Sequence, residues 1–206
     1  SKRPVVLVVM DGVGISDSEF GNAVKKAYKP TLDNLWENSP HTEIKAHGLA
    51  VGLPTDDDMG NSEVGHNALG CGQIYSQGAK LVNENIETGE IFKTETWSGL
   101  VNNCKDGKMH FLGLLSDGNV HSHINHLKAL IKKAKEDGVK EVRVHALLDG
   151  RDVPETSALT YVDDIEAYMA ELNDDSFHAC IASGGGRMTI TMDRYEANWA
   201  MVEQGW

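Results

Sequence analysis

The feature that most constrains the fold is an alternation of apolar strands and amphipathic helices in the second half of the chain. Apolar runs predict the strands, and leucines or isoleucines spaced three and four residues apart predict the helices between them. The expected order is strand, helix, strand, helix, strand, over residues 109–115, 126–136, 141–148, 160–172 and 177–182. Helices between successive strands connect parallel strands, so the sequence predicts an α/β fold with a parallel sheet.

Each predicted strand ends in a polar or glycine-rich turn. Because the carboxyl ends of parallel strands meet at one edge of a sheet, we expect the side chains of these turns to share a cleft. The candidate residues are His121, Arg151, Asp152, Arg187 and Arg194. Guanidinium groups bind phosphate and carboxylate groups through paired hydrogen bonds, which makes this edge a candidate site for a small phosphorylated acid. The alternative is that these residues only form ordinary turns, with the arginine side chains exposed to solvent.

The N-terminal part begins with a strand predicted over Pro4 to Met10, apolar on both faces. Asp11 follows at its carboxyl end, although Asp-Gly is also a common turn. A helix is predicted to begin near Pro30, and a short strand is expected over Glu43 to Ala50. The helix is expected to bury Leu32, Leu35 and Trp36.

Ser62 lies between Gly60 and Gly65, at the predicted start of a short helix that ends at Gly70-Cys-Gly72. Backbone N–H groups at a helix N-terminus favour an anion. A serine hydroxyl needs a neighbouring base or a metal to act as a nucleophile, and Asp11 is a candidate ligand of such a metal together with Ser62. A simple N-cap role for Ser62 is the alternative.

A rival metal candidate is the sequence His121-Ser-His123-Ile-Asn-His126. Histidines at this spacing after a strand occur in binuclear zinc hydrolases. Asn125 stands where such hydrolases usually offer a carboxylate, so zinc hydrolysis is retained only as the alternative function.

The charge balance is strongly acidic: Asp and Glu number 31 against 19 Lys and Arg, a net charge of −12. Such a chain repels nucleic acid and anionic membranes, so we expect neither as a partner.

The longest apolar run, Val5 to Met10, is too short for a membrane span, and we expect no signal peptide. The cysteines are Cys71, Cys104 and Cys180, expected to be free thiols in a reducing cytoplasm.

Aromatic and aliphatic residues at helical spacing occupy the C-terminal end: Tyr195, Trp199, Val202 and Trp206. This stripe stops in mid-pattern, so we expect the polypeptide to continue beyond Trp206.

Several motifs together resemble the N-terminal portion of the cofactor-independent (2,3-bisphosphoglycerate-independent) phosphoglycerate mutases. Met59-Gly-Asn-Ser-Glu-Val-Gly-His66 is the most specific of them, and Ser183-Gly-Gly-Gly-Arg-Met188 is similar to the plant and trypanosomatid branch. The others are Val5-Val-Leu-Val-Val-Met-Asp-Gly12, Ala50-Val-Gly-Leu-Pro54, Gly113-Leu-Leu-Ser-Asp-Gly118, Val120-His-Ser122, Asp149-Gly-Arg-Asp152 and Met192-Asp-Arg194.

The resemblance implies an alkaline-phosphatase-like domain with an inserted α/β transferase domain. It assigns Asp11 and Ser62 to one of two divalent metals, usually Mn²⁺ with Mg²⁺ or Co²⁺ possible, and makes Ser62 the phosphoryl acceptor. His121, Arg151, Asp152, Arg187 and Arg194 would then bind the phosphoglycerate. The implied reaction interconverts 3- and 2-phosphoglycerate in glycolysis, without added 2,3-bisphosphoglycerate, through a phosphoserine intermediate.

The resemblance also implies an organisation. Residues 1–75 would belong to the phosphatase-like, metal-binding domain and residues 76–206 to an incomplete transferase domain. The family takes most metal ligands, further arginines and a lysine from C-terminal sequence that is absent here, so we expect the isolated chain to be inactive. A cytoplasmic monomer is expected. A non-enzymatic role, binding phosphoglycerate or a partner, is a further alternative for the isolated chain.

Overall fold

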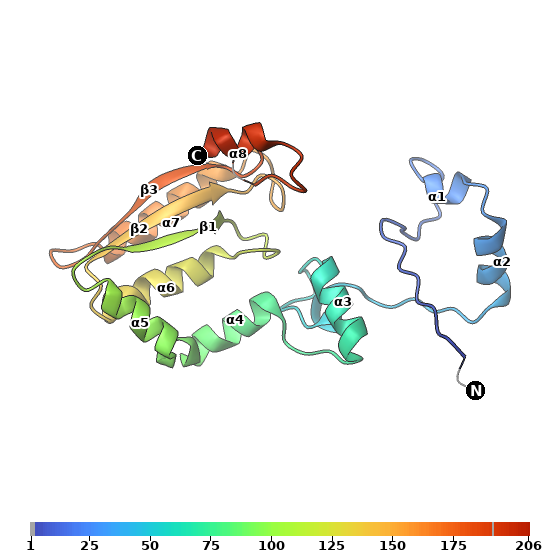
Figure 1. The fold of residues 1–206 in the computed structure, drawn as a ribbon, viewed down its shortest axis with the longest axis horizontal. Coiled ribbons are helices and arrows are strands. Elements are labelled where there is room, and N and C mark those ends of the chain that lie inside the picture. Colours follow the sequence, from blue (N-terminus) through green and yellow to red (C-terminus); the bar gives the residue numbers. More distant parts are fainter. Residues whose placement is uncertain (1–2, 191) are drawn as a thin grey trace. The chain divides into compact units, whose positions relative to one another are not determined.

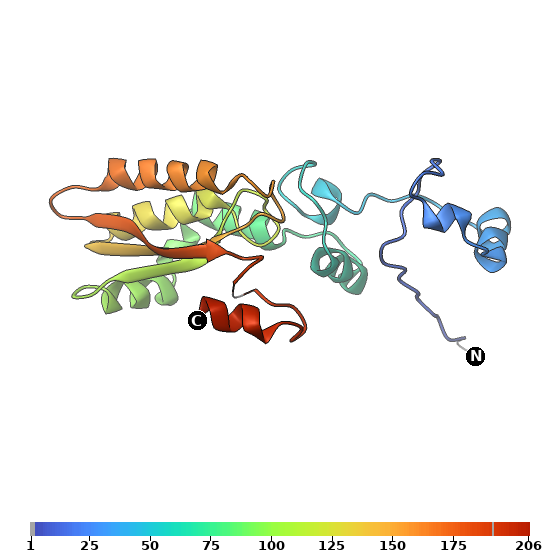
Figure 2. The same ribbon diagram turned by 90° about the horizontal axis from the view of Figure 1, so that it is seen from above.

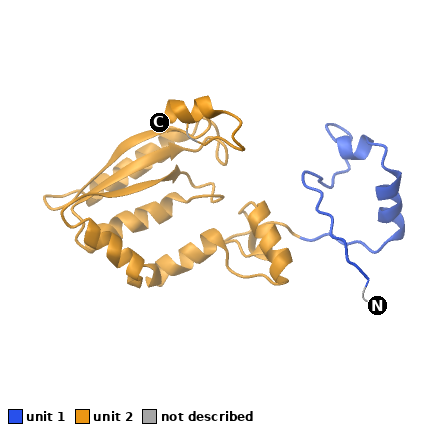
Figure 3. Ribbon diagram, in the orientation of Figure 1, with its two compact units in different colours: residues 1–44 blue, residues 45–206 orange. Residues whose placement is uncertain are grey.

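The computed structural model describes residues 3–190 and 192–206 and forms two compact units, residues 1–44 and 45–206 (Figure 3). The first unit contains α1, Ala23–Lys26, and α2, Pro30–Asn38. The helix predicted from Pro30 is therefore confirmed.

The second unit contains the remaining elements (Figure 1). They are η1 Gly48–Val51, α3 Ser62–Cys71, α4 Gly78–Glu87, η2 Glu90–Lys93, α5 Glu95–Asn103, β1 Met109–Leu115, α6 Ile124–Glu136, β2 Glu141–Leu148, α7 Ala158–Leu172, β3 His178–Gly186 and α8 Trp199–Gly205. The strands predicted over 109–115 and 141–148 have the observed bounds, and both helices between the strands are present. None of the helices that the structure describes has the length and apolar character needed to span a bilayer.

The sheet is parallel, with strand order β1-β2-β3, as the alternation of strands and helices predicts. β3 is longer than predicted because it includes the triple glycine. A Cβ atom added to Gly184 would lie 2.9 Å from the carbonyl oxygen of Ala146 on β2, so the absence of a side chain permits this close strand approach.

The main core lies between the sheet and α6 and α7, which lie on the same side of it (Figure 2). Alternate residues of β2, Val142, Val144 and Ala146, are buried, as expected for a strand with one covered face. They share a cluster with Ile131 of α6 and Ile165 of α7. Burial of this apolar surface holds the helices against the sheet.

Two predicted strands are wrong. Residues 4–10 are exposed and irregular, and the segment 43–50 is irregular until η1 begins at Gly48. A strand is stabilised by hydrogen bonds to a neighbour, and no other described segment pairs with either one. Gly48 also has a φ of +66°, a left-handed conformation that turns the chain away from an extended path.

The burial predicted for the helix after Pro30 is also wrong. Leu32, Leu35 and Trp36 are 42%, 49% and 51% exposed. These side chains line a hollow of about 550 Å³ in the first unit, together with apolar residues such as Met10 and Val13. The amphipathic stripe is therefore real, but no described residue fills the space that it faces.

Other local outcomes refine the prediction. α4 and α5 were missed, and Trp97 of α5 is buried with its Nε1–H donating to Asp137 Oδ2 at 2.7 Å. The C-terminal stripe forms a helix only from Trp199, because Tyr195 and Glu196 have left-handed φ values of 61° and 58°. Trp206 is fully exposed.

Replacing Ile131 by alanine should lower the free energy of unfolding by about 2–5 kcal/mol, because it leaves a cavity where the side chain is 0% exposed. The matched control, Leu159→Ala, removes a side chain that is 73% exposed and should cost less than about 0.5 kcal/mol. Urea denaturation followed by circular dichroism measures both. Equal losses for the two variants would contradict the assignment of the core.

Candidate functional site

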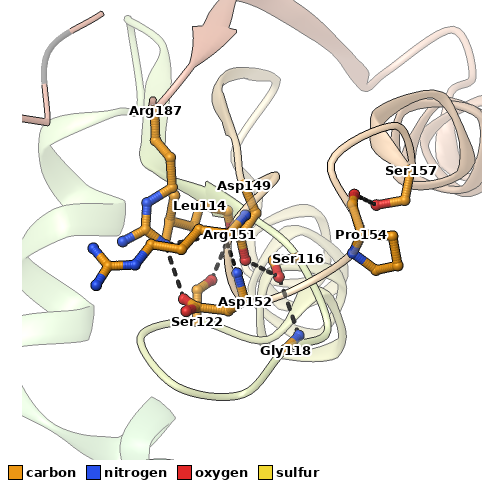
Figure 4. Close-up of polar contacts among 10 residues, drawn as sticks. All are labelled: Leu114, Ser116, Gly118, Ser122, Asp149, Arg151, Asp152, Pro154, Ser157 and Arg187. Carbon is orange, nitrogen blue, oxygen red and sulfur yellow. Dashed lines mark hydrogen bonds and ion pairs between the residues drawn. The ribbon is translucent and has the colours of Figure 1, made fainter. Parts of the chain in front are cut away.

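The loops that follow β1, β2 and β3 meet around the carboxylate of Asp149 (Figure 4). Asp149 Oδ2 accepts a hydrogen bond from Ser116 Oγ at 2.6 Å. Its Oδ1 accepts from the backbone N–H groups of Arg151 and Asp152, at 3.2 and 3.1 Å, and from Arg187 Nη1 at 2.9 Å. One buried carboxylate therefore ties together residues that follow three different strands.

The guanidinium of Arg187 is the positive partner of this carboxylate. The two side chains are 5% and 1% exposed, and Arg187 Nη1 also donates to Asp152 Oδ2 at 2.8 Å. The backbone N–H of Arg187 donates to Leu148 O at 2.8 Å, which extends the pairing of β3 with β2 by one residue. A buried charge is tolerated when it is paired and hydrogen-bonded, and both conditions hold here.

Two of the three guanidinium nitrogens of Arg187 have no hydrogen-bond partner among the residues that the structure describes. Both side-chain contacts described above use Nη1. Among residues 3–190 and 192–206, no side-chain nitrogen or oxygen is both fully buried and without a partner, so Nε and Nη2 are not completely enclosed. These N–H groups are rigidly held donors at the edge of the sheet, the arrangement that a phosphate or carboxylate requires.

The electrostatic environment keeps Asp149 ionised. Burial by itself raises the pKa of this carboxyl, but the hydrogen bonds from Ser116, from the Asp152 and Arg151 backbones and from Arg187 lower it, and the net pKa lies below its ordinary value. The network is therefore a carboxylate–guanidinium pair at neutral pH.

The loop after β1 is fixed to the same network. The backbone N–H of Gly118 donates to Ser116 Oγ at 3.0 Å. A Cβ atom on Gly118 would lie 2.9 Å from Asp152 Cβ, so a larger residue would force the two loops apart. Tyr161 of α7 donates to Asp117 Oδ1 at 2.6 Å, and this bond raises the pKa of Tyr161 to about 12.

The structure brings some of the predicted substrate residues together. Asp152 and Arg187 are in direct contact, and the Arg151 and Arg187 side chains project to the same side of the strand ends (Figure 4). Arg151 is exposed and, with Asp152, lines a hollow of about 530 Å³ that also includes Met188.

Two other predicted residues are not joined to this group. His121 is exposed in the loop after β1. Arg194 is exposed, and its Nη2 donates to Tyr195 Oη at 3.0 Å with the guanidinium over the ring at 4.8 Å. Among the described residues, no hydrogen bond or ion pair links either one to Arg187 or Asp152, so their place in a shared cleft stays a prediction.

Ser62 is the first residue of α3 and is exposed. Its alternative role as N-cap is wrong, because Asn61 is the cap and accepts a hydrogen bond from Val64 N–H at 3.0 Å. The Ser62 carbonyl accepts from His66 Nδ1 at 2.7 Å. The Ser62 hydroxyl is therefore not used in capping the helix.

Asp11 belongs to the first unit and Ser62 to the second. Asp11 is exposed and accepts a hydrogen bond from Gly12 N–H at 2.9 Å. Hard oxygen donors of this kind suit Mn²⁺, Mg²⁺ or Co²⁺. No group of three or more His, Cys, Asp or Glu side chains able to hold a metal occurs in the part of the chain that the structure describes, so these residues do not compose a complete metal site.

Two of the three histidines in the cluster, His123 and His126, make structural contacts. His123 caps α6, and its Nδ1 accepts a hydrogen bond from Asn125 N–H at 3.1 Å. His126 Nε2 is 2.5 Å from Asn83 Oδ1 and must donate to it, since an amide oxygen only accepts. Burial, and next the nearby His123, lower the pKa of His126. A nitrogen that carries this proton is not available to zinc.

Sequence reasoning missed the central role of Asp149 and Ser116. The signal that could have found Asp149 is an aspartate placed directly after an apolar strand and followed by glycine and arginine, which predicts backbone N–H groups turned back onto its carboxylate. Nothing local in the sequence distinguishes Ser116 from an ordinary turn serine.

Comparison with known proteins adds to this geometry. Residues 82–206 match the family model described as BPG-independent PGAM N-terminus. The chain belongs to the 2,3-bisphosphoglycerate-independent phosphoglycerate mutase family. It is 55% identical over 99% of its length to a probable 2,3-bisphosphoglycerate-independent phosphoglycerate mutase of Leptospira interrogans, and 51% identical over 100% of its length to the mutase of Trypanosoma brucei brucei.

A solved structure gives the same result. The crystal structure of a Leishmania mexicana phosphoglycerate mutase at low cobalt concentration matches 96% of this chain with a TM-score of 0.83 and 49% identity. The predicted α/β, alkaline-phosphatase-like fold class is thereby confirmed, as is the likeness to trypanosomatid and plant members, among them an Arabidopsis thaliana protein at 48% identity over 99% of this chain. The chain spans about 38% of the length of the Leptospira and Trypanosoma relatives, 37% of the Arabidopsis relative and 37% of the Leishmania chain.

Replacing Asp149 by asparagine should lower the free energy of unfolding at pH 7 by about 1–3 kcal/mol, because the buried Arg187 charge loses the more deeply buried of its two carboxylate partners. The pKa of Asp149 is lower in the folded state than in the unfolded state, so its contribution is complete above the unfolded value of about 3.9. That contribution disappears as the pH falls through the folded pKa. The difference between parent and variant should therefore narrow on acidification, as urea denaturation at several pH values will show.

Asp163→Asn is the matched control, because Asp163 is exposed on α7. It should leave the parent's stability at pH 7 nearly unchanged. A difference between Asp149→Asn and the parent that stays constant down to pH 2 would contradict the ionised state assigned to Asp149.

Proposed function

We propose that the chain supplies the N-terminal part of a phosphoglycerate mutase that interconverts 3-phosphoglycerate and 2-phosphoglycerate, in glycolysis and gluconeogenesis. Family membership supports the reaction class. The observation that carries the substrate assignment is the half-satisfied Arg187 guanidinium beside the exposed Arg151, at an edge where three strands end. Neutral ligands would not need two guanidinium groups there, whereas the phosphate and carboxylate of phosphoglycerate do.

In the proposed reaction, the Ser62 hydroxyl oxygen forms a bond to the substrate phosphorus while the bond from phosphorus to the glycerate oxygen breaks. The freed glycerate oxygen takes up a proton, and the phosphoryl group stays on Ser62 as a phosphoserine. The glycerate then reorients, and its other hydroxyl oxygen takes the phosphoryl group back. The isomer is released and Ser62 recovers its proton, so no outside phosphoryl donor is needed.

The arginines have separate tasks in this proposal. Arg187 is held by Asp149 and Asp152, so it presents its remaining N–H groups without further loss of side-chain freedom. Arg151 is exposed and free to close on the ligand. His121, Asp152 and Arg194 are proposed as further substrate residues, with Asp152 suited to orient Arg187 and to accept from a glycerate hydroxyl.

The proposal includes two divalent metal ions, Mn²⁺ first, with Mg²⁺ or Co²⁺ as alternatives. Cobalt in the name of the Leishmania structure supports metal dependence for that relative. Asp11 and Ser62 are proposed as two of the oxygen donors in this chain.

We further propose a cytoplasmic monomer with no nucleic-acid or membrane partner. The proposed domain boundary assigns residues 1–75 to the phosphatase-like domain and residues 76–206 to the transferase domain.

Ser62→Ala in the natural-length protein should reduce mutase activity by about a thousandfold or more, because the acceptor oxygen is lost. The assay follows formation of 2-phosphoglycerate from 3-phosphoglycerate with Mn²⁺ and without 2,3-bisphosphoglycerate. Ser98→Ala is the control, since Ser98 is an exposed serine of α5 outside the site. Full activity in Ser62→Ala would refute the phosphoserine step, and zinc-dependent hydrolysis without isomerisation would favour the hydrolase alternative.

Arg151→Ala should raise KM for 3-phosphoglycerate by about 10- to 100-fold, because a charge-assisted hydrogen bond to the substrate is removed. The variant should unfold at the same urea concentration as the parent, since the Arg151 side chain is exposed. Lys132→Ala removes an exposed cation of α6 and serves as the control for net charge. An unchanged KM in Arg151→Ala would remove Arg151 from the substrate site.

A further inference from the structure

The loop after β1 has a second point of attachment, outside the Asp149 network. Asn119 Nδ2 donates to Asp58 Oδ1 at 2.6 Å. Asn119 has a φ of +59°, a left-handed conformation that few residues other than glycine adopt without strain and that asparagine tolerates best. The backbone at Asn119 therefore adopts a conformation that suits asparagine or glycine, while its side chain makes this contact.

Asp58 is firmly held on its own side. Its Oδ2 accepts from Thr55 N–H at 2.7 Å and from Thr55 Oγ1 at 2.9 Å, and its carbonyl accepts from Gly48 N–H at 3.1 Å. Burial raises the pKa of Asp58, but the hydrogen bonds from Asn119 and Thr55 outweigh it and the pKa lies below its ordinary value. The carboxylate is thus charged, with each oxygen committed to one partner residue.

The path from Asp58 to Ser62 is short and stiff. A Cβ atom on Gly60 would lie 1.9 Å from the Ala46 carbonyl oxygen, so Gly60 is pressed against the preceding segment. Asn61 then caps α3, and Ser62 is the first residue of that helix. Asp58 is therefore only four positions from Ser62, with Gly60 and the Asn61 cap between them.

The other end of the contact is equally fixed. Asn119 lies two residues before His121. The preceding residues are anchored to the sheet edge by Ser116 and Asp149 and to α7 by Asp117 and Tyr161. The Asp58–Asn119 hydrogen bond therefore joins the segment that carries the acceptor serine to the edge that carries the arginines.

We propose that Asp58 and Asn119 are positioning residues. They hold the Ser62 hydroxyl at the distance and orientation needed to reach phosphoglycerate bound at the sheet edge. This inference rests on the proposed function. Neither side chain touches the reacting atoms. Loss of the contact lowers kcat more than it raises KM, because the arginines still bind the substrate whereas the Ser62 oxygen is misplaced.

The chemistry of the pair provides a test by exchange of the two groups in the natural-length protein. Asn119→Asp places two carboxylates in contact and should lower kcat by about 10- to 100-fold. Asp58→Asn should change kcat by less than about threefold. The oxygen of the introduced amide can still accept hydrogen bonds from Thr55. Asn119 can rotate its own amide so that its oxygen accepts from the introduced NH₂ group. The double variant Asp58→Asn/Asn119→Asp restores an amide–carboxylate bond in the reverse sense and should return kcat to within about threefold of the parent.

Two further variants complete the design. Asn119→Gly keeps the left-handed backbone but removes the side-chain amide. It should lower kcat, as Asn119→Asp does. Asn102→Asp adds the same charge on the exposed face of α5 and should leave kcat unchanged. A loss of kcat in Asn119→Asp that Asp58→Asn does not rescue would overturn the proposal, as would full activity in both Asn119 variants.

Amide hydrogen–deuterium exchange of residues 61–66 separates this inference from the proposed function. Exchange there should be faster in Asn119→Asp than in the parent and return to the parental rate in the double variant, whatever reaction the protein catalyses. If the parent has no mutase activity, the proposed function fails, and the exchange result still decides whether the contact holds Ser62 in place. Unchanged exchange in Asn119→Asp would overturn the positioning role.

Discussion

The buried pair of Asp149 and Arg187 is the interaction on which the sheet edge depends. Each charge compensates much of the hydration that the other loses on burial, and Asp152 and Ser116 supply further partners. The mutual attraction of Asp149 and Arg187 fixes the loop after β2 to the residue that ends β3, and Ser116 adds the loop after β1 to the same carboxylate. These contacts hold the three loops together at one edge of the sheet.

These contacts give the arginines different physical characters. Arg187 is preorganised, since its side chain is immobilised by two carboxylates before any ligand arrives, so little further entropy is lost on binding. Arg151 donates its backbone N–H to the same carboxylate and has an exposed side chain. In the proposed function, the fixed guanidinium would recognise the anion and the exposed one would close on it, which suits a substrate that is released and rebound in a new orientation.

The residues of the predicted site lie on several elements that are brought together only by tertiary contacts. Ser62 begins α3, and the strand-end residues lie on the far side of the predicted boundary near residue 75. Asp58 and Asn119 form a direct hydrogen bond between the loop before α3 and the loop after β1. Acceptor and substrate groups on separate elements need such a link, because errors of about 1 Å in the distance between reacting groups reduce rates severely.

The sequence by itself determined the βαβ alternation, the parallel sheet, the polar strand ends and the family, because hydrophobic periodicity and specific motifs are local properties. It failed for residues 4–10 and 43–50, since a strand exists only when another segment pairs with it. It also failed to find the roles of Asp149 and Asn119, whose partners lie up to 61 residues away in the chain. Which carboxylate meets which guanidinium or amide was decided only by the tertiary structure, because packing of the helices and strands sets those distances.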